Sequence, residues 1–155
     1  MKFRLKLSIF FALFFISLQV FQTDKSVPSY KPELEFVAST DVLKILEKSC
    51  YDCHSYKTQY PFYAYIFPIS SFLTSHIIEA REELNFSTWE EYSTEKKIEK
   101  LEDIIDEIEN KEMPILSYRI LHPESQISGD ELILIKKWVQ EFQDKENERA
   151  RKNSN

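Results

Sequence analysis

Glycine is nearly absent from this chain, and its absence restricts the folds that the chain can adopt. Gly129 is the one glycine among 155 residues, whereas tight hairpin turns depend on residues that adopt positive φ angles, which glycine does most readily. Hydrophobic residues make up 43% of the sequence and include 12 Phe and 8 Tyr, which is enough to build a core. No alternating strand pattern persists along the sequence. We therefore predict an all-α protein, a small bundle of about four or five short helices.

The N-terminal segment, residues 1–22, has the pattern of an export signal or an N-terminal membrane anchor. Lys2, Arg4 and Lys6 precede an apolar run at residues 7–21. The run has the length of a signal-peptide core and is shorter than the roughly 20 residues of a membrane-spanning helix. We expect a periplasmic or other extracytoplasmic protein, with possible membrane anchoring through the apolar run.

The remaining sequence divides into three parts. We predict a linker at 23–38, a helical domain at 39–143 and a disordered, charged tail at 144–155. Within the domain, hydrophobic periodicity predicts three helices, at 40–50, 70–84 and 94–110. Connections interrupted by prolines are predicted between these helices and after them, at 55–68 and 111–125.

Two capping boxes indicate further helix starts. Ser87 and Glu90 have the spacing that begins a short helix, and Ser128 and Glu131 repeat it before the last helix. The apolar residues of that last helix are predicted to face inward: Leu132, Ile135, Trp138, Val139 and Phe142.

The charge of the chain restricts its partners. The formal net charge is −6, and the basic residues near the N-terminus leave the predicted domain more acidic than the whole. Phosphate contacts require clusters of Lys and Arg, so this composition argues against nucleic acid as a partner. It favours a protein partner with a basic face.

The stretch "CYDCHSY" contains both cysteines of the chain, Cys50 and Cys53, and His54 follows directly. A redox dithiol of the thioredoxin kind opens a helix after a strand, but here the motif closes a helix. A zinc site would need two more ligands from His76, His122 or carboxylates, at spacings that match no familiar zinc module. The third alternative is C-x-x-C-H, the attachment motif of c-type haem.

Helical geometry favours the haem alternative. Residues three and four positions apart lie on one side of a helical turn, so Cys50, Cys53 and His54 can face the same group. Two thiols at this spacing can bind the two vinyl groups of haem as thioethers, and the imidazole beside them can bind the iron. This use consumes both thiols. We therefore predict one covalent haem c held by these residues, with His54 as the proximal iron ligand.

A sixth iron ligand could come from three residues. Met113 precedes Pro114 in a predicted loop, which places its thioether far along the chain from the C-x-x-C-H motif, and we expect it to be the distal ligand. Core filling is the ordinary role of methionine. His76, on the apolar face of the helix at 70–84, and His122, before Pro123, are the alternative ligands.

Several stretches together give a resemblance to a known family. They are "CYDCHS", "YPFYAYIFPIS", "LNFSTWEEY", "EMPILSYRILHPES" and "LILIKKWV". Over residues 40–143 the chain resembles the small bacterial haem-binding domain family, which is similar to cytochrome c. The resemblance implies a cytochrome c-like bundle around one haem, with haem c on Cys50 and Cys53, His54 as proximal ligand and Met113 as distal ligand. Class I cytochromes usually carry glycines near the Met-Pro loop, and this chain has none there.

Three functions follow from these observations. The first is a monohaem electron carrier or haem-binding module outside the cytoplasm, with a redox partner protein. The second is a sensor or a small peroxidase-like enzyme with five-coordinate haem, in which Met113 is not a ligand and His76 acts as acid or base. The third is a thiol or zinc protein without haem.

Overall fold

The computed structural model describes residues 2–21 and 23–153, and this part of the chain contains helices and no strands. The predicted all-α fold class is confirmed. The α-helices are α1 (Lys2–Leu18), α2 (Thr40–Ser49), α3 (Tyr51–His54), α4 (Ile69–Glu83), α5 (Thr94–Glu109), α6 (Leu116–Leu121) and α7 (Gly129–Asn153). Short 3-10 helices connect them: η1 (Pro32–Leu34), η2 (Phe62–Tyr65), η3 (Phe86–Glu91) and η4 (Pro123–Ser125).

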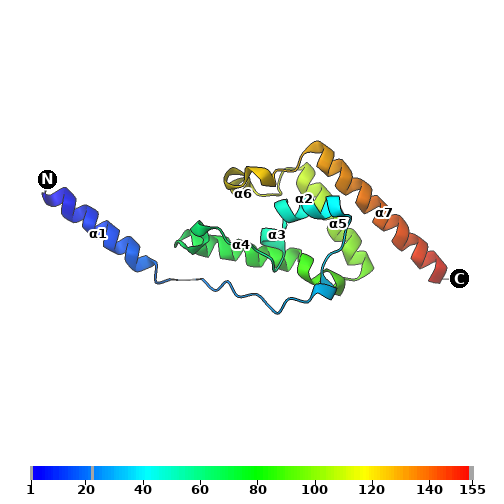
Figure 1. Cartoon of the computed structure of the whole chain (residues 1–155), viewed down its shortest axis with the longest axis horizontal. Helices are drawn as coiled ribbons and strands as arrows, with labels where there is room; N and C mark the ends of the chain where they lie inside the picture. Colours follow the sequence, from blue (N-terminus) through cyan, green and yellow to red (C-terminus); the bar gives the residue numbers. More distant parts are fainter. Residues whose placement is uncertain (1, 22, 154–155) are drawn as a thin grey trace.

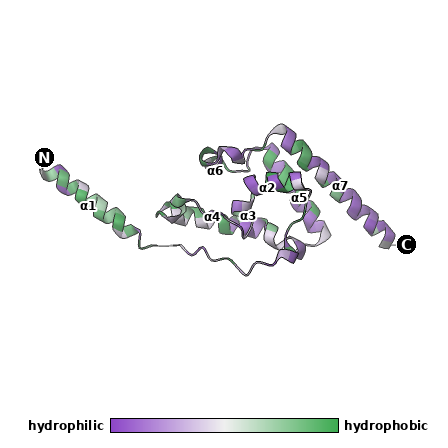
Figure 2. Ribbon diagram, viewed as in Figure 1, coloured by the Kyte–Doolittle hydropathy of each residue, from purple (hydrophilic) through white to green (hydrophobic). Residues whose placement is uncertain are grey.

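The helices form a body from which α1 extends, as Figure 1 shows. Helix α7 packs on α2 and α5, while α4 packs on α3 and η2. Figure 2 shows α1 as largely apolar and the C-terminal half of α7 as hydrophilic. Among the described helices, none has both the length and the apolar composition needed to cross a bilayer. The assignment of residues 1–22 as an export signal or anchor stays a prediction.

The residues that directly follow α1 contact the body of the molecule. The side-chain amide of Gln19 donates to the carbonyl of Phe67 at 3.3 Å and accepts from its backbone N–H at 3.0 Å. The rings of Phe21 and Phe67 lie 5.9 Å apart between centroids. The end of α1 therefore lies beside the start of α4.

The core lies between α2, α5, α7 and η3. The apolar residues Val42, Ile45 and Leu46 of α2 are buried, as are Ile135 and Val139 of α7, which were predicted to face inward. The other buried apolar residues of this cluster are Phe36, Tyr51, Leu84, Phe86, Trp89, Leu101 and Ile104.

Phe36 corrects the predicted linker at 23–38. Its side chain is only 2% exposed, and its ring contacts those of Phe86, Trp89 and Trp138 edge to face. Its backbone N–H donates to the carbonyl of Phe86 at 2.8 Å. The sequence of this segment did not indicate that Phe36 belongs to the core. The segment has no helical or strand periodicity, and a single aromatic residue cannot produce a periodic pattern.

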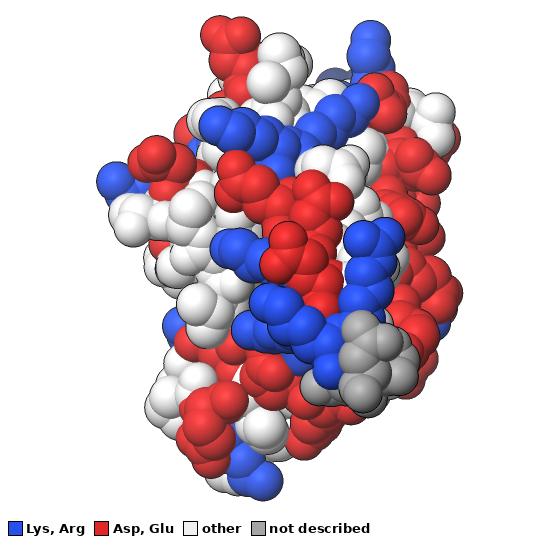
Figure 3. All heavy atoms as spheres, turned by 90° about the vertical axis from the view of Figure 1, so that its right-hand side faces the viewer, with Lys and Arg blue, Asp and Glu red and all other residues white. Residues whose placement is uncertain are grey.

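The tail prediction also requires correction. Helix α7 continues to Asn153, whereas we predicted disorder at 144–155, of which residues 154–155 lie outside the described part. The sequence "DKENERARKN" consists mainly of good helix formers. Ion pairs between Arg149 and Glu146, and between Lys152 and Glu148, join successive turns. High charge indicated disorder, but it is equally compatible with an exposed extension of a packed helix. Figure 3 shows acidic and basic side chains interspersed at this end of the molecule.

Capping contacts explain how the observed helix starts compare with the predicted ones. The second capping box is confirmed, because the N–H of Ser128 donates to the Glu131 carboxylate and the N–H of Glu131 donates to Ser128 Oγ. The first is not, because the side chain of Asn85 caps η3, and Ser87 Oγ instead accepts from the N–H of Tyr56. The predicted loop 111–125 contains α6 and η4.

Candidate functional site

The C-x-x-C-H motif lies at the junction of α2 and α3. Cys50 separates the two helices with φ −127° and ψ −35°. Its carbonyl accepts hydrogen bonds from the N–H groups of Cys53 at 3.1 Å and His54 at 2.9 Å. These bonds close one helical turn, as predicted, so the two thiols and the imidazole come from a single compact element.

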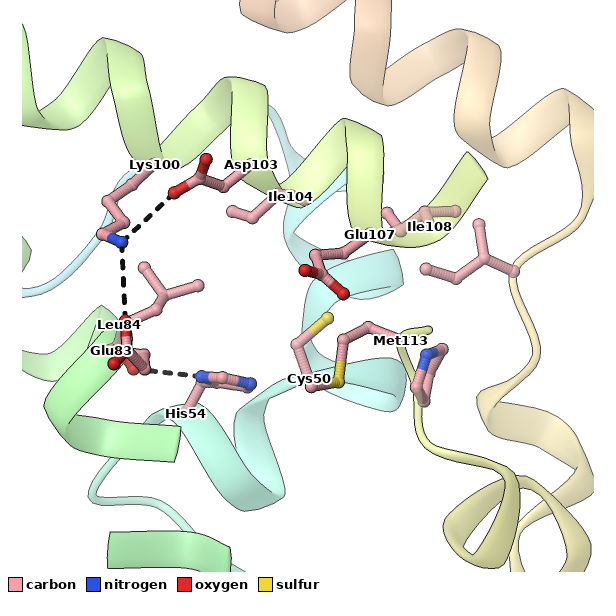
Figure 4. Close-up of a pocket in the computed structure, with 12 residues that line it drawn as sticks. Cys50, His54, Glu83, Leu84, Lys100, Asp103, Ile104, Glu107, Ile108 and Met113 are labelled. Atoms are coloured by element: carbon pink, nitrogen blue, oxygen red, sulfur yellow. Dashed lines mark hydrogen bonds and ion pairs between the residues drawn. The ribbon is translucent and has the colours of Figure 1, made fainter. Parts of the chain in front are cut away.

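Two adjoining cavities meet at this turn. The larger, of about 400 Å³, lies between α3, the end of α4, α5 and the loop before α6 (Figure 4). The smaller, of about 80 Å³, lies between α3, α4 and α6. Cys50, His54, Met113 and Pro114 line both, and Cys53 lines the smaller. The structure thus brings together the four residues that were predicted to hold haem: Cys50, Cys53, His54 and Met113. Met113 is far from the other three in the sequence.

His54 has a defined orientation and tautomer. Its Nδ1 lies 2.9 Å from the carbonyl oxygen of Ala80 and 3.1 Å from that of Leu84. Since carbonyls only accept, Nδ1 carries the proton, and Nε2 keeps a free lone pair. Figure 4 shows this second nitrogen pointing toward Cys50 and Met113. Burial lowers the pKa of His54, against the opposing effect of the two carbonyl hydrogen bonds, which favours the neutral form that binds metals.

The two cysteines are free thiols. Burial raises the pKa of Cys50 to about 12 and that of Cys53 to about 11. Cysteines that perform thiol–disulfide exchange have lowered pKa values, because the thiolate is the reactive form. Across the described residues, no group of three or more His, Cys, Asp and Glu side chains is placed to hold a metal ion. The raised pKa values of the two thiols therefore argue against the redox-dithiol alternative.

The end of α5 fixes the position of Met113. The N–H of Lys111 bonds to the carbonyl of Ile108 at 3.1 Å, and the N–H of Glu112 bonds to the carbonyl of Glu107 at 2.9 Å. This is the Schellman motif, with Lys111 at φ 62° in the position that glycine usually occupies. The N–H of Met113 also bonds to Glu107, at 3.1 Å. The absence of glycine from this loop is thus compensated by a lysine in left-handed conformation.

Known protein families provide a match for this chain. A haem-binding domain family matches residues 13–141, which is most of the chain. This chain belongs to the haem-binding domain family. Comparisons with curated proteins and with solved structures gave no match. The matched range begins inside α1, well before the start of our predicted domain at residue 39.

The lining of the larger cavity suits the haem that the family name implies. Apolar side chains form much of its wall, from Leu84, Ile104, Ile108 and Ile127. Its volume falls in the range of small-molecule and cofactor sites. A nitrogen ligand with its other nitrogen hydrogen-bonded, two thiols and one thioether border the same space. These residues fit haem.

The two remaining histidines differ in their relation to the haem-binding cavities. His76 lines the smaller cavity, and its Nδ1 donates to the carbonyl of Phe72 at 3.0 Å. His122 lines neither cavity. Its Nε2 lies 2.7 Å from the Tyr63 hydroxyl oxygen, and its Nδ1 lies 3.3 Å from the Glu124 carboxylate. Among the alternatives for the sixth ligand, His76 is therefore the better placed histidine.

The larger cavity has a charged rim that was not predicted from the sequence. Glu83, Lys100, Asp103 and Glu107 all line the larger cavity. From the sequence alone, the charged face of the helix at 94–110 is indistinguishable from a solvated surface, because charges of both signs are interspersed along it. Ile104 and Ile108 gave a signal, since they lie four residues apart on the apolar stripe, but that stripe also describes a core-facing helix.

Proposed function

We propose that this chain is an exported monohaem c-type protein that carries electrons. In this proposal Cys50 and Cys53 hold haem through thioether bonds, His54 Nε2 is the proximal iron ligand and Met113 is the distal ligand. The observation that carries the proposal is the hydrogen bonding of His54 Nδ1 to two backbone carbonyls, while both thiols and the Met113 thioether line the same connected cavities.

The residues of the site have separate roles. Haem, when bound, supplies a one-electron Fe(III)/Fe(II) couple. The carbonyls of Ala80 and Leu84 keep the imidazole of His54 in one tautomer and increase its basicity. The thioether of Met113, as a soft ligand, raises the reduction potential relative to a second histidine. The apolar wall excludes water, which favours the less charged state of the site.

The proposed location and partner rest on charge and on α1. Residues 1–22 provide the export signal or anchor, consistent with attachment of haem c outside the cytoplasm. Acidic side chains outnumber basic ones over the chain, and Figure 3 shows areas of carboxylate on one face. A redox partner with a basic face would associate faster with such a surface.

A five-coordinate sensor or small peroxidase-like protein is the alternative. Two observations favour it: Met113 is 37% exposed, and His76 lines the cavity beside it. If Met113 left the iron, His76 would be the available acid or base on that side.

Visible absorption spectra of the haem-loaded protein test these proposals. We expect a low-spin spectrum, and in the ferric state the weak far-red band of methionine–iron ligation. Met113→Ala should abolish that band, whereas Leu116→Ala, at an exposed position of α6, should retain it. A high-spin wild-type spectrum with ready binding of carbon monoxide would favour the five-coordinate alternative.

Covalent attachment has its own test. Denaturation followed by precipitation should leave haem on the wild-type chain and release it from the Cys50→Ser, Cys53→Ser double variant. Haem that is extracted from the wild type would contradict the c-type assignment. A colourless protein would contradict haem binding altogether.

A further inference from the structure

Lys100 is a half-buried cation at the wall of the larger cavity. Its side chain is only 12% exposed, although it belongs to the charged face of α5. Its ammonium lies 3.2 Å from the Asp103 carboxylate and 4.0 Å from the Glu83 carboxylate (Figure 4). Among the residues that line the two cavities, Lys100 is the one Lys or Arg.

The carboxylate partners of Lys100 are much more exposed than Lys100 itself. The Asp103 and Glu83 side chains are 52% and 82% exposed. A cation that is partly removed from water is stabilised best by a charge partner that is itself held in place. Exposed carboxylates contribute little, because water and salt screen them and their side chains stay mobile. The ammonium is therefore available to a carboxylate that enters from the cavity side.

Haem brings two such carboxylates. Its two propionates lie on the edge of the porphyrin opposite the edge that carries the two vinyl groups. In the proposed function, Cys50 and Cys53 hold the vinyl edge, and the larger cavity extends from Cys50 and His54 to Lys100. Resting on that proposed function, we propose that Lys100 binds a haem propionate and thereby fixes the orientation of the cofactor.

The acidic residues around Lys100 increase the need for its positive charge. Glu83, Asp103 and Glu107 border the same cavity, so a propionate there meets three carboxylates and one ammonium. Lys100 supplies the attraction that offsets their repulsion. Its positive charge near the haem also stabilises the reduced state, which carries one positive charge less than the oxidised state.

Resonance Raman spectra and the reduction potential of the haem-loaded full chain test the proposal. The bending band of the propionates reports their hydrogen bonding. Lys100→Gln should shift this band and lower the reduction potential, and Lys100→Arg should retain both values. Lys97→Gln is the matched control: Lys97 lies on the same helix, is 14% exposed and pairs with Glu90, but lines neither cavity.

The outcomes separate the two proposals. If haem is bound and Lys100→Gln has the wild-type band and potential, or differs no more than Lys97→Gln, the role of Lys100 is wrong while the proposed function stands. If the wild type binds no haem, both are wrong. Should Lys100→Gln fail to fold, Asp103→Asn removes the competing carboxylate and should shift the propionate band in the direction of a stronger hydrogen bond. An unchanged band in that variant would overturn the proposal.

Discussion

The imidazole of His54 and the carbonyl of Ala80 are joined by a 2.9 Å hydrogen bond between α3 and α4. Ala80 lies in the last turns of α4, and Leu84, just after that helix, provides a second acceptor for the same nitrogen. The C-terminal end of α4 therefore orients a side chain of α3. Because both acceptors are backbone groups, their position depends on how α4 packs and on no single neighbouring side chain.

Removal of the His54 side chain should separate haem attachment from ligation. We expect His54→Ala to keep haem on Cys50 and Cys53 but to lose the low-spin spectrum, because the proximal nitrogen is absent. Added imidazole should restore the low-spin spectrum by occupying the space of the deleted ring. His76→Ala should remain low-spin without imidazole. A low-spin spectrum of His54→Ala alone would show that another residue is the proximal ligand.

Lys111 should be replaceable by glycine with a gain in stability. Its φ of 62° lies in the left-handed region, which costs a residue with a Cβ atom about 1 kcal/mol. Urea unfolding should show Lys111→Gly to be more stable than the wild type by up to that amount. Asn110→Gly, at φ −76°, is the control and should be destabilising, by up to about 1 kcal/mol. Equal losses in both variants would contradict the capping argument.

The sequence predicted the structure well where it contained a motif or a long stretch of helical periodicity. The helices at 70–84 and 94–110 were predicted to within one residue of α4 and α5, because their apolar stripes are long. The position of Cys50, Cys53 and His54 on one turn followed from helical spacing alone. Their haem ligation stays a prediction, as does that of Met113.

Tertiary contacts decided what the sequence could not show. Helix α6 was expected to be part of a loop, because Pro114 and Pro123 flank this segment. In the structure its apolar residues Leu116, Ile120 and Leu121 are exposed. Side-chain contacts hold α6 instead, through Tyr118 to Asp52. In the sequence, Lys100 cannot be distinguished from other lysines of a solvated helix face. Only the structure shows that it lines the larger cavity.

Phe36 should be essential for stability although it precedes every predicted helix of the domain. Its buried ring contacts three other aromatic rings, and truncation of such a residue costs about 3–5 kcal/mol. Urea unfolding of Phe36→Ala should show a loss of this size. The neighbouring Val37 is 77% exposed, so Val37→Ala should have little effect. A loss below about 1 kcal/mol for Phe36→Ala would mean that the segment before residue 39 is not part of the folded core.

Glu131 should make stability depend on pH in the acidic range. Burial raises the pKa of Glu131, but hydrogen bonds from Lys48 and Ser128 outweigh it and hold the pKa below its ordinary value of 4.5. A carboxylate with a lowered pKa in the folded state stabilises the fold above its unfolded pKa. That contribution is lost as the pH falls below 4.5 and through the lower folded pKa.

Unfolding free energies at pH 7 and near pH 3 measure this effect. Glu131→Gln keeps an acceptor for Ser128 but has no charge to lose, so its stability should fall less over this range than that of the wild type. At pH 7 it should be less stable by about 0.5–1 kcal/mol. Glu109→Gln, in an exposed pair with Lys136, should follow the wild-type pH dependence. Identical pH dependence of Glu131→Gln and the wild type would contradict the role of this carboxylate.

Tyr118 should hold α6, and with it the loop that carries Met113, against the haem-binding turn. Its hydroxyl donates to the Asp52 carboxylate at 2.7 Å, and Asp52 lies between the two cysteines. A hydrogen bond to a charged group contributes about 1.5 kcal/mol or more. Tyr118→Phe removes this bond but keeps the ring that stacks on His122 at 4.4 Å. Amide hydrogen exchange should therefore speed up in α6 by roughly tenfold, with α7 unchanged.

Tyr65→Phe is the control for this prediction. It removes the same atom from a 53% exposed ring on the N-terminal side of α4 and should leave exchange in α6 as it is. Unaltered α6 exchange in Tyr118→Phe would mean that packing alone positions the Met113 loop.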